Sequence, residues 1–163
     1  HNIEYFNQVL PTTFVRTSIP SEPGDGGAPI FDLRGNLIGM LTVSLPEFRA
    51  SFVLPCRAIE RIKDDILFSG KVNYAFAGLD VKIDPEQRGD VVKVTSVDKA
   101  SPAEKAGVQI GDRILSMGEF KIRSREDLLN AYFFMRPGDT VPLVVERKGK
   151  RKTLKVFVSI KKK

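Results

Sequence analysis

Ser101–Gly107 reads SPAEKAG and Gly111–Met117 reads GDRILSM, and these two neighbouring stretches are the most specific motif of the chain. Ser101 suits the cap of a short helix and Pro102 its first position, while Gly107 is a residue that commonly ends one. The second stretch begins with a turn and continues into an apolar run of strand type. The pair therefore predicts a turn–helix–strand unit in the second half of the chain.

The flanking sequence predicts the rest of this unit. A second helix should begin at a capping box, in which the side chains of Ser124 and Asp127 each accept a hydrogen bond from the other residue's backbone N–H. Alternating apolar residues then predict a hairpin that turns at Lys148-Gly149-Lys150. The predicted elements are a strand at Val91–Val94, a helix at Ser124–Met135 ended by Arg136–Asp139, and strands at Thr140–Arg147 and Thr153–Ile160.

In this order, the elements of Tyr74–Ile160 resemble a PDZ domain of the bacterial HtrA type. The resemblance implies that an extended peptide adds to a sheet edge, with its C-terminal carboxylate held by backbone N–H groups of a glycine-containing loop. Phe76-Ala77-Gly78-Leu79 matches the family's pattern for that loop, aromatic-apolar-Gly-apolar. Asp80–Ile83 would be the strand that pairs with the peptide.

The resemblance also gives candidate site residues. An apolar pocket for the last peptide side chain would lie between the loop and the second helix, where residues four apart share one face. A Cβ at Gly78 would crowd the bound carboxylate. For Val81 and Leu128, a plain core position is the open alternative. The expected peptide-binding residues are Phe76, Ala77, Gly78, Leu79, Val81, Leu128 and Tyr132.

A glycine-rich loop organises the first part of the chain: Pro23-Gly24-Asp25-Gly26-Gly27-Ala28-Pro29. Such a run suits a tight turn, and a plain turn is one interpretation of it. It also resembles the nucleophile loop Pro-Gly-Asn-Ser-Gly-Gly-Pro-Leu of HtrA/Deg serine proteases. The flanking strands resemble that family too, at Phe14–Thr17 and Ser51–Pro55.

The resemblance to the protease loop fails at the position of the catalytic nucleophile. Gly26 falls on the nucleophilic serine, and glycine has no hydroxyl to attack a peptide bond. The only histidine is His1, so this chain cannot supply a Ser-His-Asp site by itself. Backbone N–H groups could still form something like an oxyanion hole, which alone does not catalyse acyl transfer. No catalytic residue is expected in the degenerate loop, which comprises Gly24, Asp25, Gly26 and Gly27.

The predicted fold class is mainly β with α. A partial trypsin-like β-barrel, the C-terminal half of one, is followed by an α+β PDZ domain. Residues 1–69 would form the protease-like part, 70–73 a linker, 74–160 the PDZ domain and 161–163 a basic tail. The protease-like part should hold strands at Ile3–Val9, Phe14–Thr17, Ile30–Phe31, Leu37–Val43 and Ser51–Leu54, then a helix at Arg57–Phe68 ended by Gly70. Apolar residues of that helix, spaced three to four apart, should face the core, with Arg61 opposite.

Composition limits the classes of function. The chain has 163 residues, 42% of them apolar and 28% charged, which is typical of globular domains. No apolar run is long enough to span a bilayer. The chain does not begin with Met, so we expect a fragment of a longer protein. Cys56 is the single cysteine, which excludes an internal disulfide, and with one histidine a zinc site is not expected. No cofactor is predicted.

Charge is unevenly distributed. Residues 1–72 carry seven Lys/Arg against eight Asp/Glu, whereas residues 73–163 carry 19 against 12. Nine basic residues lie between Arg147 and Lys163 without an acid among them. We interpret them as a solvated hairpin turn and tail. A nucleic-acid partner is not expected, because the interleaved aromatic residues of a single-strand platform are missing. A membrane surface is left open.

The sequence predicts a peptide-binding PDZ module of a proteolytically inactive HtrA-like protein. It would recognise C-termini or extended segments in protein quality control. The resemblance implies an extracytoplasmic location and a homo-oligomer formed through the protease-like part. One alternative is a regulatory fragment of an active serine endopeptidase whose catalytic residues are supplied elsewhere. Another is a scaffold in which the protease-like part binds the partner.

Overall fold

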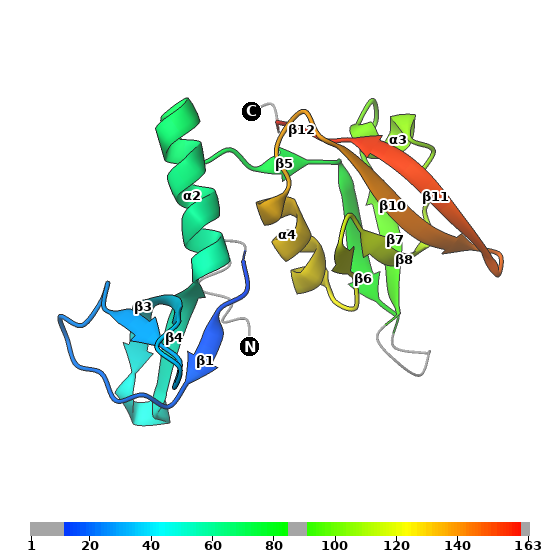
Figure 1. Ribbon diagram of the computed structural model, residues 1–163. Coiled ribbons are helices and arrows are strands. Elements are labelled where there is room, and N and C mark those ends of the chain that lie inside the picture. Colours follow the sequence, from blue (N-terminus) through cyan, green and yellow to red (C-terminus); the bar gives the residue numbers. More distant parts are fainter. Residues whose placement is uncertain (1–11, 85–90, 161–163) are drawn as a thin grey trace. The chain divides into compact units, whose positions relative to one another are not determined.

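The structure is a computed structural model that describes residues 12–84 and 91–160 (Figure 1). It divides into two compact units, residues 1–72 and 73–163, and each is described by itself. The strand expected at Ile3–Val9 and the tail at 161–163 lie outside the described residues. The limits predicted for the protease-like part, the linker and the PDZ domain stay predictions.

The first unit is an open antiparallel sheet with one long helix. Its strand order is β1-β4-β3-β2, and the described strands do not close into a barrel. Strand β4 is buried from Ala50 to Leu54, which makes it the centre of the small core. The elements are β1 Val15–Thr17, β2 Pro29–Phe31, β3 Leu37–Leu45, a 3₁₀ turn at Pro46–Phe48, β4 Ala50–Pro55 and α2 Cys56–Ser69.

Helix α2 has the predicted extent but not the predicted orientation. It ends at Gly70, whose backbone N–H donates to the Ile66 carbonyl. Its buried residues are Ala58, Arg61 and Asp65, and Arg61 forms an ion pair with Asp65 one turn on. The prediction that Arg61 lies opposite the core was wrong. Leu67 is 71% exposed, because the open sheet of this unit covers only one side of the helix.

The second unit contains a sheet of strand order β11-β10-β8-β7-β6, so β6 and β11 are its two edges. Strand β9 adds to β8, and β12 pairs separately with β5. Helix α4 packs against β5, β6 and β9, whereas α3 packs against β11 (Figure 1). The elements are β5 Ala75–Phe76, β6 Leu79–Ile83, β7 Val92–Val97, α3 Pro102–Lys105, β8 Arg113–Met117, β9 Phe120–Lys121, α4 Arg125–Phe134, β10 Thr140–Arg147, β11 Lys150–Phe157 and β12 Ser159–Ile160.

The predicted helix caps are confirmed. The Ser101 hydroxyl accepts a hydrogen bond from the backbone N–H of Glu104, at 3.1 Å, at the start of α3. Ser124 and Asp127 form the full capping box of α4. These bonds satisfy N–H groups that have no partner within the helix, which fixes where each helix begins.

The hairpin differs from its prediction at both ends. Only Lys148 and Gly149 form the turn, with φ of 51° and 72°. Positive φ at both turn residues matches the twist of the flanking strands, so pairing continues to the Arg147–Lys150 pair and β11 begins at Lys150. Strand β11 ends at Phe157, and Ser159–Ile160 leave the sheet to pair with β5.

The core of the second unit is apolar and continuous. Side chains from the sheet and from α4 pack together, and Leu143, Met117 and Val156 are fully buried. Burial of each such side chain contributes about 1.5–3 kcal/mol. This core holds β6 and α4 against each other and so positions the groove between them.

Candidate peptide-binding groove and the glycine loops

A cavity of about 330 Å³ is lined by residues of β6 and α4 and of the flanking strands. Four of the expected site residues contribute to it: Phe76, Leu79, Leu128 and Tyr132. Its polar rim contains Asp80, Asp98 and Arg125, together with Ser96. The structure thus brings together an apolar floor and a mixed polar rim beside an edge strand.

Three expected residues lie outside this lining. Ala77 is fully buried and Val81 is 2% exposed, and both belong to the core cluster. For Val81, this is the alternative that the sequence left open. Leu128 is likewise 2% exposed and belongs to the core cluster, although it also lines the cavity. Gly78 lies in the connection between β5 and β6 with φ of 75°. Any contribution of Ala77 and Gly78 to binding therefore comes from the backbone.

The carbonyl groups of this connection are held by the segment that leads into α3. The Ala77 carbonyl accepts from the N–H of Ala103 at 2.8 Å, and the Gly78 carbonyl accepts from the N–H of Asp98 at 2.9 Å. The Ser101 hydroxyl adds a third bond, to the Gly78 carbonyl at 3.3 Å. The two carbonyls therefore face the same segment.

The orientation of the N–H groups follows from these bonds. No peptide bond in the described chain is cis, and a trans peptide directs its N–H opposite to its C=O. The N–H groups of Gly78 and Leu79 share peptide units with the two held carbonyls. Both consequently point away from the α3 segment. Two successive N–H groups on one side of a glycine turn make a concave anion-binding site.

The structure gives its own reason for glycine at position 78, besides the positive φ. A Cβ built there would collide with the Ser101 Cβ and would lie 2.9 Å from the Ser101 hydroxyl oxygen. The expectation that it would also crowd a bound carboxylate stays a prediction. A side chain at this position would displace the bonds that orient the loop.

Tyr132, one of the residues that line the cavity, has an unusual hydroxyl group. Its oxygen is buried and has no hydrogen-bond partner among residues 12–84 and 91–160. Burial, reinforced by the charges of Asp80 and Asp98, raises the pKa of Tyr132 well above its ordinary value. The group is therefore a neutral hydrogen-bond donor at all ordinary pH values.

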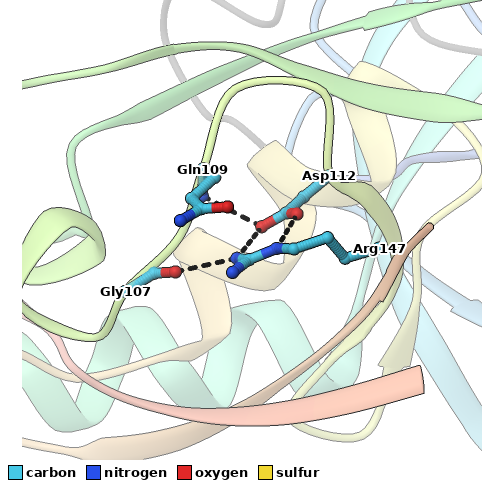
Figure 2. Close-up of polar contacts among 4 residues, drawn as sticks. All are labelled: Gly107, Gln109, Asp112 and Arg147. Carbon is cyan, nitrogen blue, oxygen red and sulfur yellow. Dashed lines mark hydrogen bonds and ion pairs between the residues drawn. The ribbon is translucent and has the colours of Figure 1, made fainter. Parts of the chain in front are cut away.

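A partly buried ion pair at the loop after α3 was missed by sequence reasoning (Figure 2). Arg147 donates to both carboxylate oxygens of Asp112, at 2.6 and 2.7 Å, and to the Gly107 carbonyl at 2.8 Å. The N–H of Gln109 donates to Asp112 at 2.9 Å. Burial opposes ionisation of Asp112, but the bonds from Arg147 and Gln109 and the charge of Arg147 outweigh it and lower its pKa. The pair fixes the loop after α3 to the end of β10.

The glycine-rich loop of the first unit forms an ordered turn. The N–H of Ala28 donates to the Asp25 carbonyl at 3.0 Å, and the N–H of Gly27 donates to the Leu41 carbonyl at 2.8 Å. A Cβ built on Gly26 would meet nothing within 4 Å. A serine side chain would therefore fit at this position, but the chain has none there.

Neither a metal cluster nor a membrane-spanning helix is found in the described part of the chain. No group of three or more His, Cys, Asp or Glu side chains there is arranged to hold a metal ion. Among the same residues, no helix is both long and apolar enough to cross a bilayer.

Comparisons with known proteins agree with this architecture. Residues 78–158 match the family model described as "PDZ domain". A probable periplasmic serine endoprotease DegP-like of Pseudomonas fulva is 32% identical over 160 residues, which cover 89% of this chain and 33% of that relative. Serine protease Do-like HtrB of Bacillus subtilis is 31% identical over 159 residues, covering 86% of this chain and 35% of the relative. The chain spans about a third of the length of these relatives.

Solved structures show the same likeness. The HtrA-type protease AlgW with tripeptide superposes with a TM-score of 0.67 at 26% identity, over 92% of this chain and 54% of that one. AlgW with decapeptide gives a TM-score of 0.64, also at 26% identity, over 92% of this chain and 50% of that one. The second unit is thus a PDZ domain. The chain as a whole belongs to the HtrA/Deg family.

Proposed function

We propose that the PDZ domain of this chain binds the C-termini or extended segments of other polypeptides. The observation that carries the proposal is the orientation of two successive N–H groups, those of Gly78 and Leu79. The carbonyls of the same peptide units are held by Ala103, Asp98 and Ser101, so the N–H groups face away from α3 and can donate to a carboxylate.

The rest of the groove suits an extended peptide. Strand β6 is an edge of the sheet, so its outer row of backbone groups can pair with an added strand. Phe76, Leu79 and Leu128 supply an apolar wall for the last side chain. The buried Tyr132 hydroxyl needs an acceptor, which a peptide carbonyl would provide.

The groove charges suggest a preference upstream of the C-terminus. Asp80 and Asp98 both line the cavity, and Arg125 lies 3.6 Å from the Asp80 carboxylate. A basic or neutral side chain in the peptide would be favoured next to this rim, because like charges repel. Acidic residues at these peptide positions should weaken binding.

We further propose that this chain does not itself hydrolyse peptides. Gly26 occupies the nucleophile position of the family's loop, and the only histidine of the sequence is His1. The AlgW structures contain a tripeptide and a decapeptide, which supports peptide binding as the family activity that this chain retains. The relatives named periplasmic support an extracytoplasmic location. We propose in addition a role in protein quality control and a homo-oligomer formed through the first unit.

A second function rests on the relatives' names. The DegP-like relative is called a serine endoprotease and HtrB a serine protease, and this chain spans about a third of each. It would then be the regulatory part of an active serine endopeptidase. Hydrolysis of a fluorogenic peptide by the full-length protein would favour that function.

The proposal is tested by fluorescence-anisotropy titration with apolar-tailed peptides as free acids and as C-terminal amides. We expect the acids to bind at least about tenfold more tightly than the amides. Leu129→Asp, which places a negative charge in the groove lining, should abolish the difference. The matched change Leu33→Asp, at a fully exposed position of the first unit, should leave it intact. Equal binding of acids and amides would contradict carboxylate capture.

A further inference from the structure

The second unit contains another concave surface, which shares Phe76 and Asp98 with the groove beside α4 but extends along α3 and the end of β11. A cavity of about 830 Å³ is lined by α3, by the residues before it, and by the ends of β11 and β12. We call it the lysine cavity. It is larger than the groove of about 330 Å³ beside α4, and β11 is the opposite edge of the sheet from β6.

The wall of the lysine cavity is apolar and uncovered. Phe157 is 59% exposed and Ile160 is 55% exposed, and Pro102 and Ala106 extend the wall from the α3 side. Large apolar side chains gathered at a hollow of a folded domain mark a binding surface more often than scattered ones do. This wall can therefore bury an apolar side chain of a partner.

The rim carries unneutralised positive charge. Lys99, Lys105 and Lys155 line the cavity. Within the described part of the chain, none of them has an ion pair or a hydrogen bond from its side chain. Strand β11 reads KRKTLKVF, with four basic residues and no acid. Such a rim attracts a negatively charged ligand.

The nearby carboxylates do not cancel this charge. Glu104 of α3 accepts a bond from the backbone N–H of Ala100 at 2.6 Å and is turned toward that loop. Asp98 is the one acidic residue in the lining. Three lysines against one aspartate leave the cavity net positive.

We propose that the lysine cavity binds an acidic segment of a partner protein that carries an apolar side chain. It needs no free C-terminus, so it is distinct from carboxylate capture by the glycine loop. A protein segment fits better than a lipid surface, because the charges line a hollow rather than a protruding face. The edge strand β11 also offers backbone groups on its outer side to an extended chain.

The test uses the 163-residue chain and a peptide whose amidated C-terminus cannot be held as a carboxylate by the glycine loop. The probe is Asp-Leu-Glu-Leu-Asp-Leu-Glu, amidated at its C-terminus and labelled with a neutral fluorophore at its N-terminus. We expect it to bind, and the double charge reversal Lys105→Glu with Lys155→Glu to weaken binding at least about tenfold. The matched reversal Lys121→Glu, at an exposed position of β9 outside both cavities, should change it less than about twofold.

Charge-neutralising substitutions at the same two lysines control for misfolding of the charge-reversal variant. Lys105→Gln with Lys155→Gln should weaken binding about threefold or more, and raising salt to about 0.5 M should weaken binding to the unaltered chain. The same peptide with Asn and Gln in place of its acids should bind at least about tenfold more weakly.

Three results would overturn the proposal. The first is equal binding of the acidic and the Asn/Gln peptides. The second is acidic-peptide affinity that both lysine pairs leave unchanged. The third is binding to phosphatidylglycerol vesicles, lost in the Lys105/Lys155 variants, while the peptide does not bind. None of these results depends on whether free-acid peptides enter the α4 groove, so the two proposals fail independently.

Discussion

The hydroxyl of Ser101 connects the start of α3 to the glycine loop. It accepts from the Glu104 N–H at 3.1 Å as a helix cap and donates to the Gly78 carbonyl at 3.3 Å. The residue that begins the helix therefore also orients the peptide unit whose N–H belongs to Leu79. The position of α3 and the orientation of the candidate carboxylate site are set together.

Gly78→Ala should damage both stability and binding. Its φ of 75° is strained for alanine, and the new Cβ would collide with Ser101. We expect a loss of about 2–3 kcal/mol in the free energy of unfolding by urea, and loss of free-acid peptide binding. Gly149→Ala is the matched control, because its φ is 72° but no atom lies within 4 Å of the added Cβ. It should cost about 1 kcal/mol and leave peptide affinity unchanged. Equal costs for the two variants would contradict the role of Ser101.

Arg147→Gln should destabilise the second unit. It leaves the carboxylate of Asp112, which is 1% exposed, without its charged partner. We expect a cost of about 2–3 kcal/mol in urea unfolding. Arg113→Gln removes a longer ion pair to Glu146, 3.8 Å apart and half-exposed, and should cost less than about 1 kcal/mol. A similar small cost for both arginines would show that the buried pair contributes little.

The pH dependence of this pair has a definite sign. Asp112 has a pKa below its ordinary value of 3.8, so the folded state binds its proton more weakly than the unfolded state does. Its contribution is complete above the unfolded pKa and is lost as the pH falls through the lower, folded one. The difference in unfolding free energy between the unaltered chain and Asp112→Asn should be constant above about pH 5 and shrink below about pH 4. An unfolding free-energy difference that stays the same below about pH 4 would refute the lowered pKa of Asp112.

Tyr132→Phe should weaken peptide binding without lowering the stability of the free protein. Removing a buried hydroxyl without a partner should leave the free protein as stable or stabilise it by about 1 kcal/mol. If the peptide supplies the missing acceptor, the same change should weaken peptide binding about three- to tenfold. Thermal unfolding and anisotropy titration of one sample measure both effects. Reduced stability with unchanged affinity would contradict this role.

Gly26→Ser tests the absence of hydrolysis. The added side chain has open space around it, so the first unit should remain folded. Because the chain has no histidine besides His1 to activate the serine, we expect no cleavage of a fluorogenic peptide or of casein. Measurable cleavage by this variant would show that a catalytic base is present.

Features set by neighbouring residues could be predicted from the sequence. The caps at Ser101 and Ser124 and the helix end at Gly70 depend on residues within one helical turn, and the structure has all three. The PDZ class and the HtrA/Deg family followed from motifs of this local kind.

Features that join distant residues could not be predicted in the same way. Asp112 and Arg147 are 35 residues apart, and neither position alone indicates the other. The pairing of β12 with β5 brings Ser159 to Phe76. The burial of Arg61 depends on which face of α2 the open sheet covers, whereas the apolar periodicity of the helix indicated another face.

We propose that the backbone N–H groups of Gly78 and Leu79 donate hydrogen bonds to a peptide carboxylate. The most direct measurement is the backbone amide ¹H–¹⁵N spectrum of the chain during titration with one apolar-tailed peptide, first as the free acid and then as the amide. We predict that the Gly78 and Leu79 amide protons shift strongly downfield with the acid and little with the amide, as charge-assisted hydrogen bonds require. Unmoved Gly78 and Leu79 signals in the presence of saturating free acid would contradict the account.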